Sequence, residues 1–200
     1  MTTNTAERLD ADELLHLAMR ASEANRHEES ISYLKRALDV SPKNGKIHYM
    51  LGAEHAQIGL YDRAAEEMAK AVELDPTLHT ASFQLGLLHI TSGRVGPAEA
   101  AWKPLDTLGA EHPLYLFKTG LLHLARDEFE QCADHLNRGI SLNRLNEPLN
   151  NDMRRVLADV DKHLGKPADS GAAPTATEKS TPSNHVLLSA YRKNRSDDKE

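Results

Sequence analysis

Hydrophobic and polar positions along this chain repeat every 34 residues, in four blocks that begin at residues 11, 45, 79 and 113. One column of the repeat holds small residues and another holds large ones: Ser30, Ala64, Ala98 and Cys132, then Leu34, Met68, Trp102 and Leu136. Each block follows the helical period twice, and the residues between its two halves tolerate a left-handed backbone: Asn25, Gly59, Gly93 and Asp127. The pattern predicts an all-α, right-handed solenoid of helix-turn-helix units.

Two further features refine this expectation. A second column of small residues, which includes Gly52, Gly86 and Gly120, predicts that the helices approach each other closely. Pro104 lies deep inside the second helix of block three, where it should kink that helix or end it early because it lacks an N–H donor.

The repeats and their capping helix are predicted to cover residues 11–165. The amino-acid composition changes on both sides of this range. Residues 1–10 are polar and predict a flexible N-terminus without a signal-peptide core. One apolar stripe after block four predicts a capping helix at about residues 148–164: Leu149, Met153, Val156, Val160 and Leu164. Residues 166–183 are rich in Pro, Ala, Ser, Thr and Gly, so we expect residues 166–200 to be a disordered tail. The tail contains a short apolar and basic segment at 184–195.

Over about residues 11–164 these columns resemble the tetratricopeptide repeat (TPR) family. The best match is block two, through Leu51, Gly52, Gly59, Tyr61, Ala64, Met68, Ala71 and Pro76. Where the family often has a tyrosine, this chain departs with Ala21, His55, His89 and His123. The resemblance implies an inner face, lined by the first helix of each repeat, that binds a peptide.

One apolar ladder falls on this expected inner face. Its members are Leu15, Met19, Tyr49, Ala53, Phe83, Leu87, Ile90, Phe117, Leu121 and Leu124. Within one helix they are three or four residues apart and share a face, and an apolar groove of this length exceeds what a monomer normally exposes. We predict that the groove binds an apolar peptide. The alternative is that the superhelix closes tightly enough to bury these side chains on each other.

The same positions exclude one known binding mode of the family. Relatives that hold the acidic tail of heat-shock chaperones use lysine and asparagine there, whereas this chain has aromatic and aliphatic residues. A carboxylate clamp is therefore not expected.

No catalytic sequence motif indicates an enzyme. The sequence lacks the G-x-S-x-G, P-loop, H-E-x-x-H and C-x-x-C patterns, so we expect neither catalytic residues nor a cofactor. The histidine ladder (His55, His89 and His123) is not expected to bind metal, because helices pack about 8–10 Å apart and ligands of one zinc ion lie much closer together. Cys132 falls in the small-residue column, so we expect it to be buried.

Charge and composition narrow the possible partners. The formal net charge of −6 disfavours nucleic acid. No apolar stretch is long enough to span a bilayer, so membrane insertion is not expected either. A single cysteine and the absence of a secretion signal predict a cytoplasmic location.

We therefore predict a non-catalytic protein–protein interaction module, an adaptor or assembly factor that binds an apolar peptide segment. The alternative is a dedicated cytoplasmic chaperone for an aggregation-prone or secreted client. The tail carries its own apolar motif, Val186, Leu187, Leu188 and Tyr191. Because a tethered segment acts at high effective concentration, the tail is a candidate occupant of the chain's own groove, with a plain disordered tail as the alternative.

Overall fold

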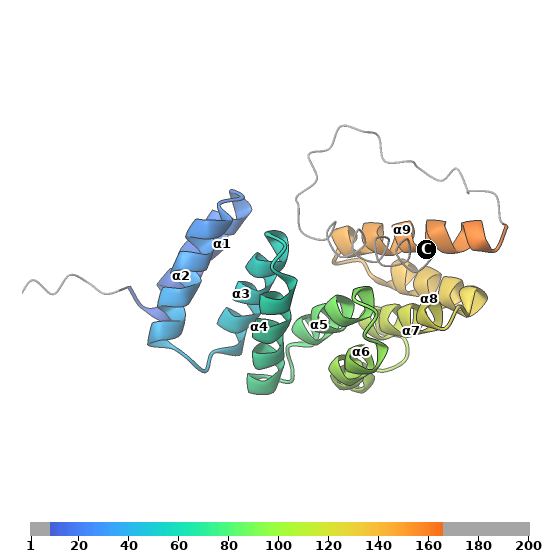
Figure 1. The fold of residues 1–200 in the computed structure, drawn as a ribbon, viewed down its shortest axis with the longest axis horizontal. Helices are drawn as coiled ribbons and strands as arrows, with labels where there is room; N and C mark the ends of the chain where they lie inside the picture. The colour runs from blue at the N-terminus through green and yellow to red at the C-terminus, as the bar shows by residue number, and fades with distance from the viewer. Residues whose placement is uncertain (1–8, 166–200) are drawn as a thin grey trace, which may run out of the picture. The chain divides into compact units, whose positions relative to one another are not determined.

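The computed structural model describes residues 9–165, and every regular element in this part of the chain is helical (Figure 1). The elements are α1 (Ala11–Glu23), α2 (His27–Val40), α3 (Gly45–Gln57), α4 (Tyr61–Leu74), α5 (His79–Thr91), α6 (Val95–Trp102), the 3-10 helix η1 (Lys103–Leu108), α7 (Pro113–Ala125), α8 (Phe129–Leu142) and α9 (Glu147–His163). Each of the four sequence blocks forms a pair of helices, so the predicted all-α fold is confirmed.

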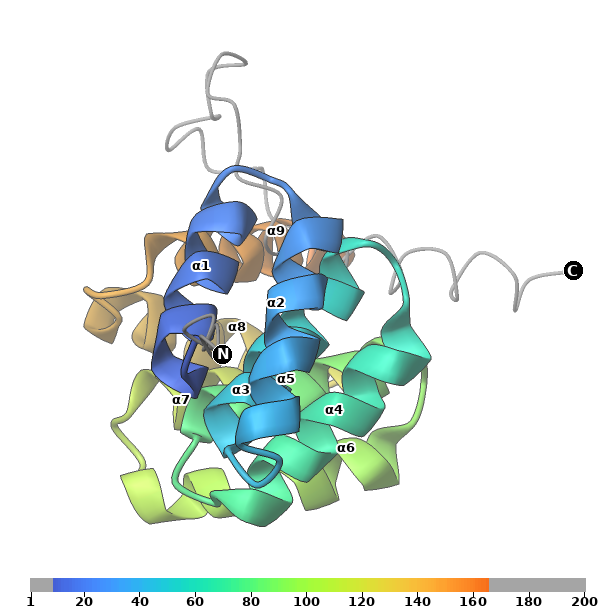
Figure 2. The same ribbon diagram turned by 90° about the vertical axis from the view of Figure 1, so that its left-hand side faces the viewer.

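The chain divides into two compact units, Met1–Ala81 (unit 1) and Ser82–Glu200 (unit 2). Unit 1 contains α1 to α4, and Figure 2 shows its first two helices side by side. Unit 2 contains most of α5 and all the later helices.

Left-handed residues form the turn between the two helices of each repeat. Asn25 and Asp127 have φ angles of 56° and 58°, and Gly59 and Gly93 have φ angles of 79° and 71°. The predicted turn column is therefore confirmed in all four blocks. A residue with positive φ lets the chain reverse directly after the first helix.

A glycine allows the paired helices α3 and α4 of unit 1 to pack closely. A Cβ atom on Gly52 of α3 would lie 2.8 Å from Cγ of Met68 and 3.0 Å from the carbonyl oxygen of Ala64, both on α4. One apolar cluster continues from α1 through α2 to α3: Leu14, Ala18, Leu34, Ala37, Ile47 and Leu51.

In unit 2, Pro104 interrupts the second helix of block three as predicted. The α-helix ends at Trp102, and the chain continues as η1. Lys118 of α7 stabilises this change of helix type, since its ammonium group donates to the carbonyl of Trp102 at 3.5 Å and pairs with Asp106. The early end of α6 leaves Trp102 buried at the centre of the unit 2 core.

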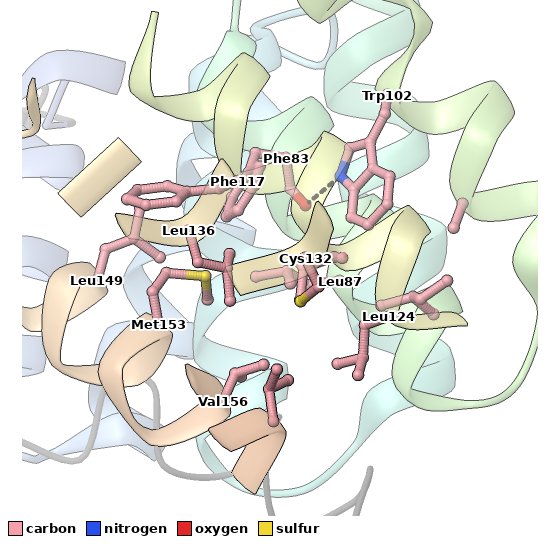
Figure 3. Packing of buried hydrophobic residues seen from close by; sticks show 14 of the residues in the cluster. Phe83, Leu87, Trp102, Phe117, Leu124, Cys132, Leu136, Leu149, Met153 and Val156 are labelled. Carbon is pink, nitrogen blue, oxygen red and sulfur yellow. Dashed lines mark hydrogen bonds between the residues drawn. The ribbon is translucent and has the colours of Figure 1, made fainter. Parts of the chain in front are cut away.

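A single glycine makes room for that tryptophan. A Cβ atom on Gly86 of α5 would lie 2.0 Å from Nε1 of Trp102. The same Nε1 donates a hydrogen bond of 2.9 Å to the carbonyl of Phe83, drawn as a dashed line in Figure 3. Position, packing and hydrogen bonding of the indole therefore all depend on the absence of a side chain at residue 86.

The last helix, α9, covers the end of the unit 2 core. Its apolar stripe, Leu149, Met153, Val156 and Val160, is buried in the same cluster as Phe117, Leu136 and Cys132. The side chain of Asn146 accepts from the backbone N–H of Leu149 at 3.0 Å and begins the helix. The tail predicted for residues 166–200 lies outside the described residues.

Removing α9 should destabilise the protein. A chain ending at Gly165 should melt within a few degrees of the full chain, whereas one ending at Asn143 should melt well below it. Each fully buried apolar side chain contributes about 1.5–3 kcal/mol before entropy is counted. Thermal unfolding followed by circular dichroism measures both; equal melting points for the two truncated chains would show that α9 does not stabilise the core.

Gly86→Ala should destabilise the protein by about 1–3 kcal/mol or more, because the new methyl group overlaps the indole of Trp102. Gly96→Ala is the matched control, since a Cβ atom on helical Gly96 meets nothing within 4 Å. That substitution should stabilise the helix by about 0.5–1 kcal/mol. Urea unfolding measures both free energies, and a neutral Gly86→Ala would contradict the packing described above.

Candidate peptide-binding face

The six ladder residues in unit 2 lie in its hydrophobic core. Phe83 is 1% exposed and Phe117 is fully buried. Leu87, Ile90, Leu121 and Leu124 are each less than one-tenth exposed and belong to the same cluster (Figure 3). Their burial favours the alternative in which these side chains pack on each other.

Specific contacts hold both phenylalanine rings inside unit 2. The ring of Phe83 stacks on Trp102, with a centroid distance of 6.1 Å, and lies 6.4 Å from the ring of Phe117. Phe117 in turn fills the space beside Gly139 of α8, where a Cβ atom would lie 2.5 Å from the phenylalanine Cε1. These aromatic rings therefore stabilise the unit.

In unit 1 the ladder remains accessible. Met19 is 44% exposed, and Leu15, Tyr49 and Ala53 are half-buried. These four residues, which we call the unit 1 face, occupy equivalent positions on α1 and α3, four residues apart on each helix. Leu15 also packs against the cluster of unit 1, so the face rests on a rigid core.

Carboxylates flank the unit 1 face on α1. Asp12 precedes Leu15 by three residues and Glu23 follows Met19 by four, so both lie on the same side of the helix as the apolar pair. Both are exposed, and neither has an ion-pair partner among the described residues. On α3, Lys46 precedes Tyr49 by three residues. The α1 edge is therefore acidic and the start of α3 is basic.

Two histidines of unit 1 contact glutamates in pairs that the sequence analysis missed. His27 contacts Glu54 at 2.8 Å, and His48 contacts Glu67 at 2.6 Å and the carbonyl of Pro42 at 3.1 Å. Burial alone would raise the pKa of Glu67, but hydrogen bonds from His48 and Lys70 hold that pKa below its ordinary value. Glu54 is only 3% exposed. Its signal in the sequence was a charged residue in a column that holds leucine in the two later repeats, at Leu88 and Leu122.

The remaining candidate residues of unit 2 are buried or make local contacts. Burial raises the pKa of the Cys132 thiol to about 12, so it is protonated at neutral pH. His123 hydrogen-bonds Glu128 and lies against His135, with ring centroids 5.1 Å apart. Within residues 9–165, no group of three or more His, Cys, Asp or Glu side chains is placed to hold a metal ion. The tail motif at Val186, Leu187, Leu188 and Tyr191 lies outside the described residues.

Comparison with known proteins identifies the repeats. The tetratricopeptide repeat family model matches residues 15–79. The chain is 35% identical over 130 residues to the Arabidopsis thaliana protein CTR9 homolog, which covers 60% of this chain and 12% of that protein. It is 24% identical over 111 residues to the BBSome complex member BBS4 of Bos taurus, covering 56% of this chain and 21% of that protein. The chain thus spans only a small part of the length of both relatives.

Solved structures show the same fold. The APC/C heterotetramer Cut9–Hcn1 has a TM-score of 0.69 at 19% identity, over 78% of this chain and 30% of that chain. A tetratricopeptide repeat protein of Parabacteroides merdae has a TM-score of 0.68 at 17% identity, over 97% and 74%. TTC0263, a thermophilic TPR protein of Thermus thermophilus, has a TM-score of 0.62 at 17% identity, over 78% and 84%.

The fold thus defines a helical-repeat protein, an α-solenoid of helix-turn-helix units. Residues 15–79 match the tetratricopeptide repeat family model, and the chain has the fold of solved TPR proteins. This family supports a role as a protein–protein interaction module, and its scaffolds are generally non-catalytic. None of the helices between residues 9 and 165 is long and apolar enough to cross a bilayer.

Stability should fall when the pH drops below the ordinary histidine pKa of 6.5. Burial lowers the pKa values of His55 and His89, and their Nδ1 atoms are buried without a hydrogen-bond partner. Both histidines are therefore neutral in the folded protein. As the pH falls from 6.5 through their lower folded pKa values, the unfolded chain binds protons at these two residues more readily than the folded protein does, and the free energy of unfolding decreases.

The measurement is the free energy of urea unfolding across this pH range. The double variant His55→Phe with His89→Phe should lose part of the pH dependence. His16→Phe is the control, because His16 is exposed and hydrogen-bonds only a backbone carbonyl of its own helix. An identical pH dependence in the double variant and the wild type would contradict the assignment.

Proposed function

We propose that this chain is an adaptor that binds an apolar segment of a partner protein on the unit 1 face. The observation that supports this most is the accessibility of Met19, at 44% exposure, beside three half-buried apolar residues of the same face. These residues lie on the first helices of their repeats, which line the inner face in related proteins. In unit 2 the equivalent positions are buried, which focuses the proposal on unit 1.

Each residue of the face suits a role in binding. Methionine is unbranched and polarisable, so Met19 can adapt to the shape of an incoming side chain. Tyr49 offers a large, stiff anchor with a polar tip. The carboxylates of Asp12 and Glu23 would orient a segment that carries basic residues and would speed its association. The face therefore favours a partner segment in which aliphatic and basic residues adjoin.

The segment at residues 184–195 of the chain itself has this composition. Val186, Leu187, Leu188 and Tyr191 are apolar, and basic residues follow them at 192, 193 and 195. A synthetic peptide of residues 184–195 is therefore a defined first probe, added to a chain that ends at Gly165 so that the tail cannot compete.

Met19→Lys and Tyr49→Ala should weaken binding of this peptide by at least about tenfold, because truncating an anchor at the centre of a contact costs about 1–2 kcal/mol or more. Neither should lower the free energy of unfolding by more than about 1 kcal/mol. Phe83→Ala is the contrasting variant and should cost about 3–5 kcal/mol of stability, as Trp102→Ala should, because both side chains are buried. Isothermal titration and urea unfolding measure the two quantities. Undiminished peptide binding by both face variants would refute the proposed site.

A second experiment separates an adaptor from a dedicated chaperone. An adaptor bridges two proteins, whereas a chaperone of this kind holds one client. Pull-downs with the full chain and with a chain ending at Gly165 should recover different sets of proteins if residues 166–200 recruit a second partner. Identical sets would favour the chaperone.

A further inference from the structure

The end of α8 and the segment that joins it to α9 carry exposed apolar side chains. Leu145 is 100% exposed, the highest value among the large hydrophobic residues of the described chain, and Leu142 is 45% exposed. We call Leu142, Arg144 and Leu145 the α8–α9 anchor. A single exposed leucine is ordinary, but here two exposed leucines and an exposed arginine fall within four residues of the chain.

Hydrogen bonds hold this segment in one conformation. The side-chain amide of Asn143 donates to the carbonyl of Asn146 at 3.1 Å and to Oδ1 of Asn150 at 2.9 Å. The amide of Asn150 donates back to the carbonyl of Asn143 at 2.8 Å, and Asn150 is itself only 2% exposed. Because both ends of the segment are fixed, Leu145 would lose little conformational entropy on binding.

Charges around the anchor leave one cation without a partner. Glu147 pairs with Arg154 at 2.6 Å, and Arg138 pairs with Glu111 at 2.6 Å. Arg144 is exposed and has no ion-pair partner among residues 9–165. A surface that accepts the anchor should therefore combine apolar side chains with an unpaired carboxylate.

The unit 1 face has this combination. Leu15 and Met19 are accessible, and the exposed carboxylates of Asp12 and Glu23 lie on the same side of α1 without ion-pair partners in the described chain. We propose that the α8–α9 anchor of one copy docks on the unit 1 face of a second copy, with the leucines against Met19 and the guanidinium of Arg144 against a carboxylate. This rests on the proposed function, because it names a second copy of the chain as one ligand of the same face.

The anchor and the face are different surfaces, so the contact is heterologous. One contact leaves a free anchor on one copy and a free face on the other, and growth continues unless a second contact closes the pair. The interface is small, so association should appear between micromolar and millimolar concentration. Salt should weaken it, because the Arg144 pair is exposed.

Sedimentation equilibrium of the purified full chain tests the proposal. The average mass should rise above the monomer mass of 22.1 kDa with concentration. Leu145→Asp should hold the mass at the monomer value, and Arg144→Glu should weaken association by at least about tenfold. Leu60→Asp is the matched control: Leu60 is also an exposed leucine, at 39%, but lies outside both surfaces and should leave the curve unchanged. Circular dichroism checks that each variant is folded.

A charge swap distinguishes this contact from other modes of self-association. Arg144→Glu alone and the double variant Asp12→Arg with Glu23→Arg should each associate weakly, because each places like charges together. An equimolar mixture should recover association, since both pairings between the two variants join opposite charges. A wild-type chain that stays monomeric, or a mixture without recovery, would overturn the proposal. The proposal would also be overturned if removal of residues 166–200 abolished association and Leu145→Asp did not. In that case the tail, and not the anchor, would occupy the unit 1 face.

The peptide titration separates failure of this inference from failure of the proposed function. Leu145→Asp leaves the unit 1 face intact and should bind the 184–195 peptide as the wild-type repeats do. If that variant and the wild type both bind the peptide while the wild type stays monomeric, only the self-docking is wrong. If the peptide does not bind but the wild type self-associates through the anchor, the peptide proposal fails while the accessible face stands.

Discussion

This structure depends on the close approach of paired helices at glycine positions. Gly52 faces Met68, Gly86 faces Trp102 and Gly120 faces Leu136, and in each pair a Cβ atom on the glycine would lie within 2.9 Å of the large residue. The helices thus interdigitate at the same column of every repeat after the first. Because protein interiors are close-packed, the volume absent from one helix sets the volume that its neighbour must supply.

The same constraint explains why the apolar ladder behaves differently in the two units. In block four, Gly139 leaves space that the ring of Phe117 fills. The corresponding residue of block two is Ala71, which carries a Cβ atom, and Tyr49 remains half-buried. Phe83 instead stacks on Trp102, the last residue of α6. The local volume beside each ladder position therefore decides whether its side chain becomes core or stays accessible.

Sequence periodicity predicted the helices, the left-handed turns and the interruption at Pro104, because each depends on the type of residue at a fixed place in the repeat. It could not predict the exposure of the ladder. Periodicity assigns a residue to a face of its helix, but burial depends on contacts with residues far away in sequence, such as Gly139 for Phe117. The pair formed by His27 and Glu54 was missed for the same reason, since its two members come from different repeats. The available signal was a glutamate at a position where the two later repeats have leucine, and it points to a buried partner because an unpaired buried carboxylate is costly.

Burial of the aromatic residues in unit 2 has a consequence for binding. A rigid scaffold lowers the entropy lost when a partner docks, and unit 2 gains that rigidity from rings that are then no longer accessible. Accessible apolar groups remain at the unit 1 face and at Leu145, and both are held by ordered structure: the face by the cluster that contains Leu14 and Ile47, and Leu145 by the hydrogen bonds of Asn143 and Asn150. The two surfaces also carry charges of opposite sign that have no ion-pair partner among residues 9–165. Packing fills the interior of unit 2 and leaves small apolar surfaces with charges elsewhere. The proposed contacts require this arrangement, because several weak contacts gain affinity when they are combined.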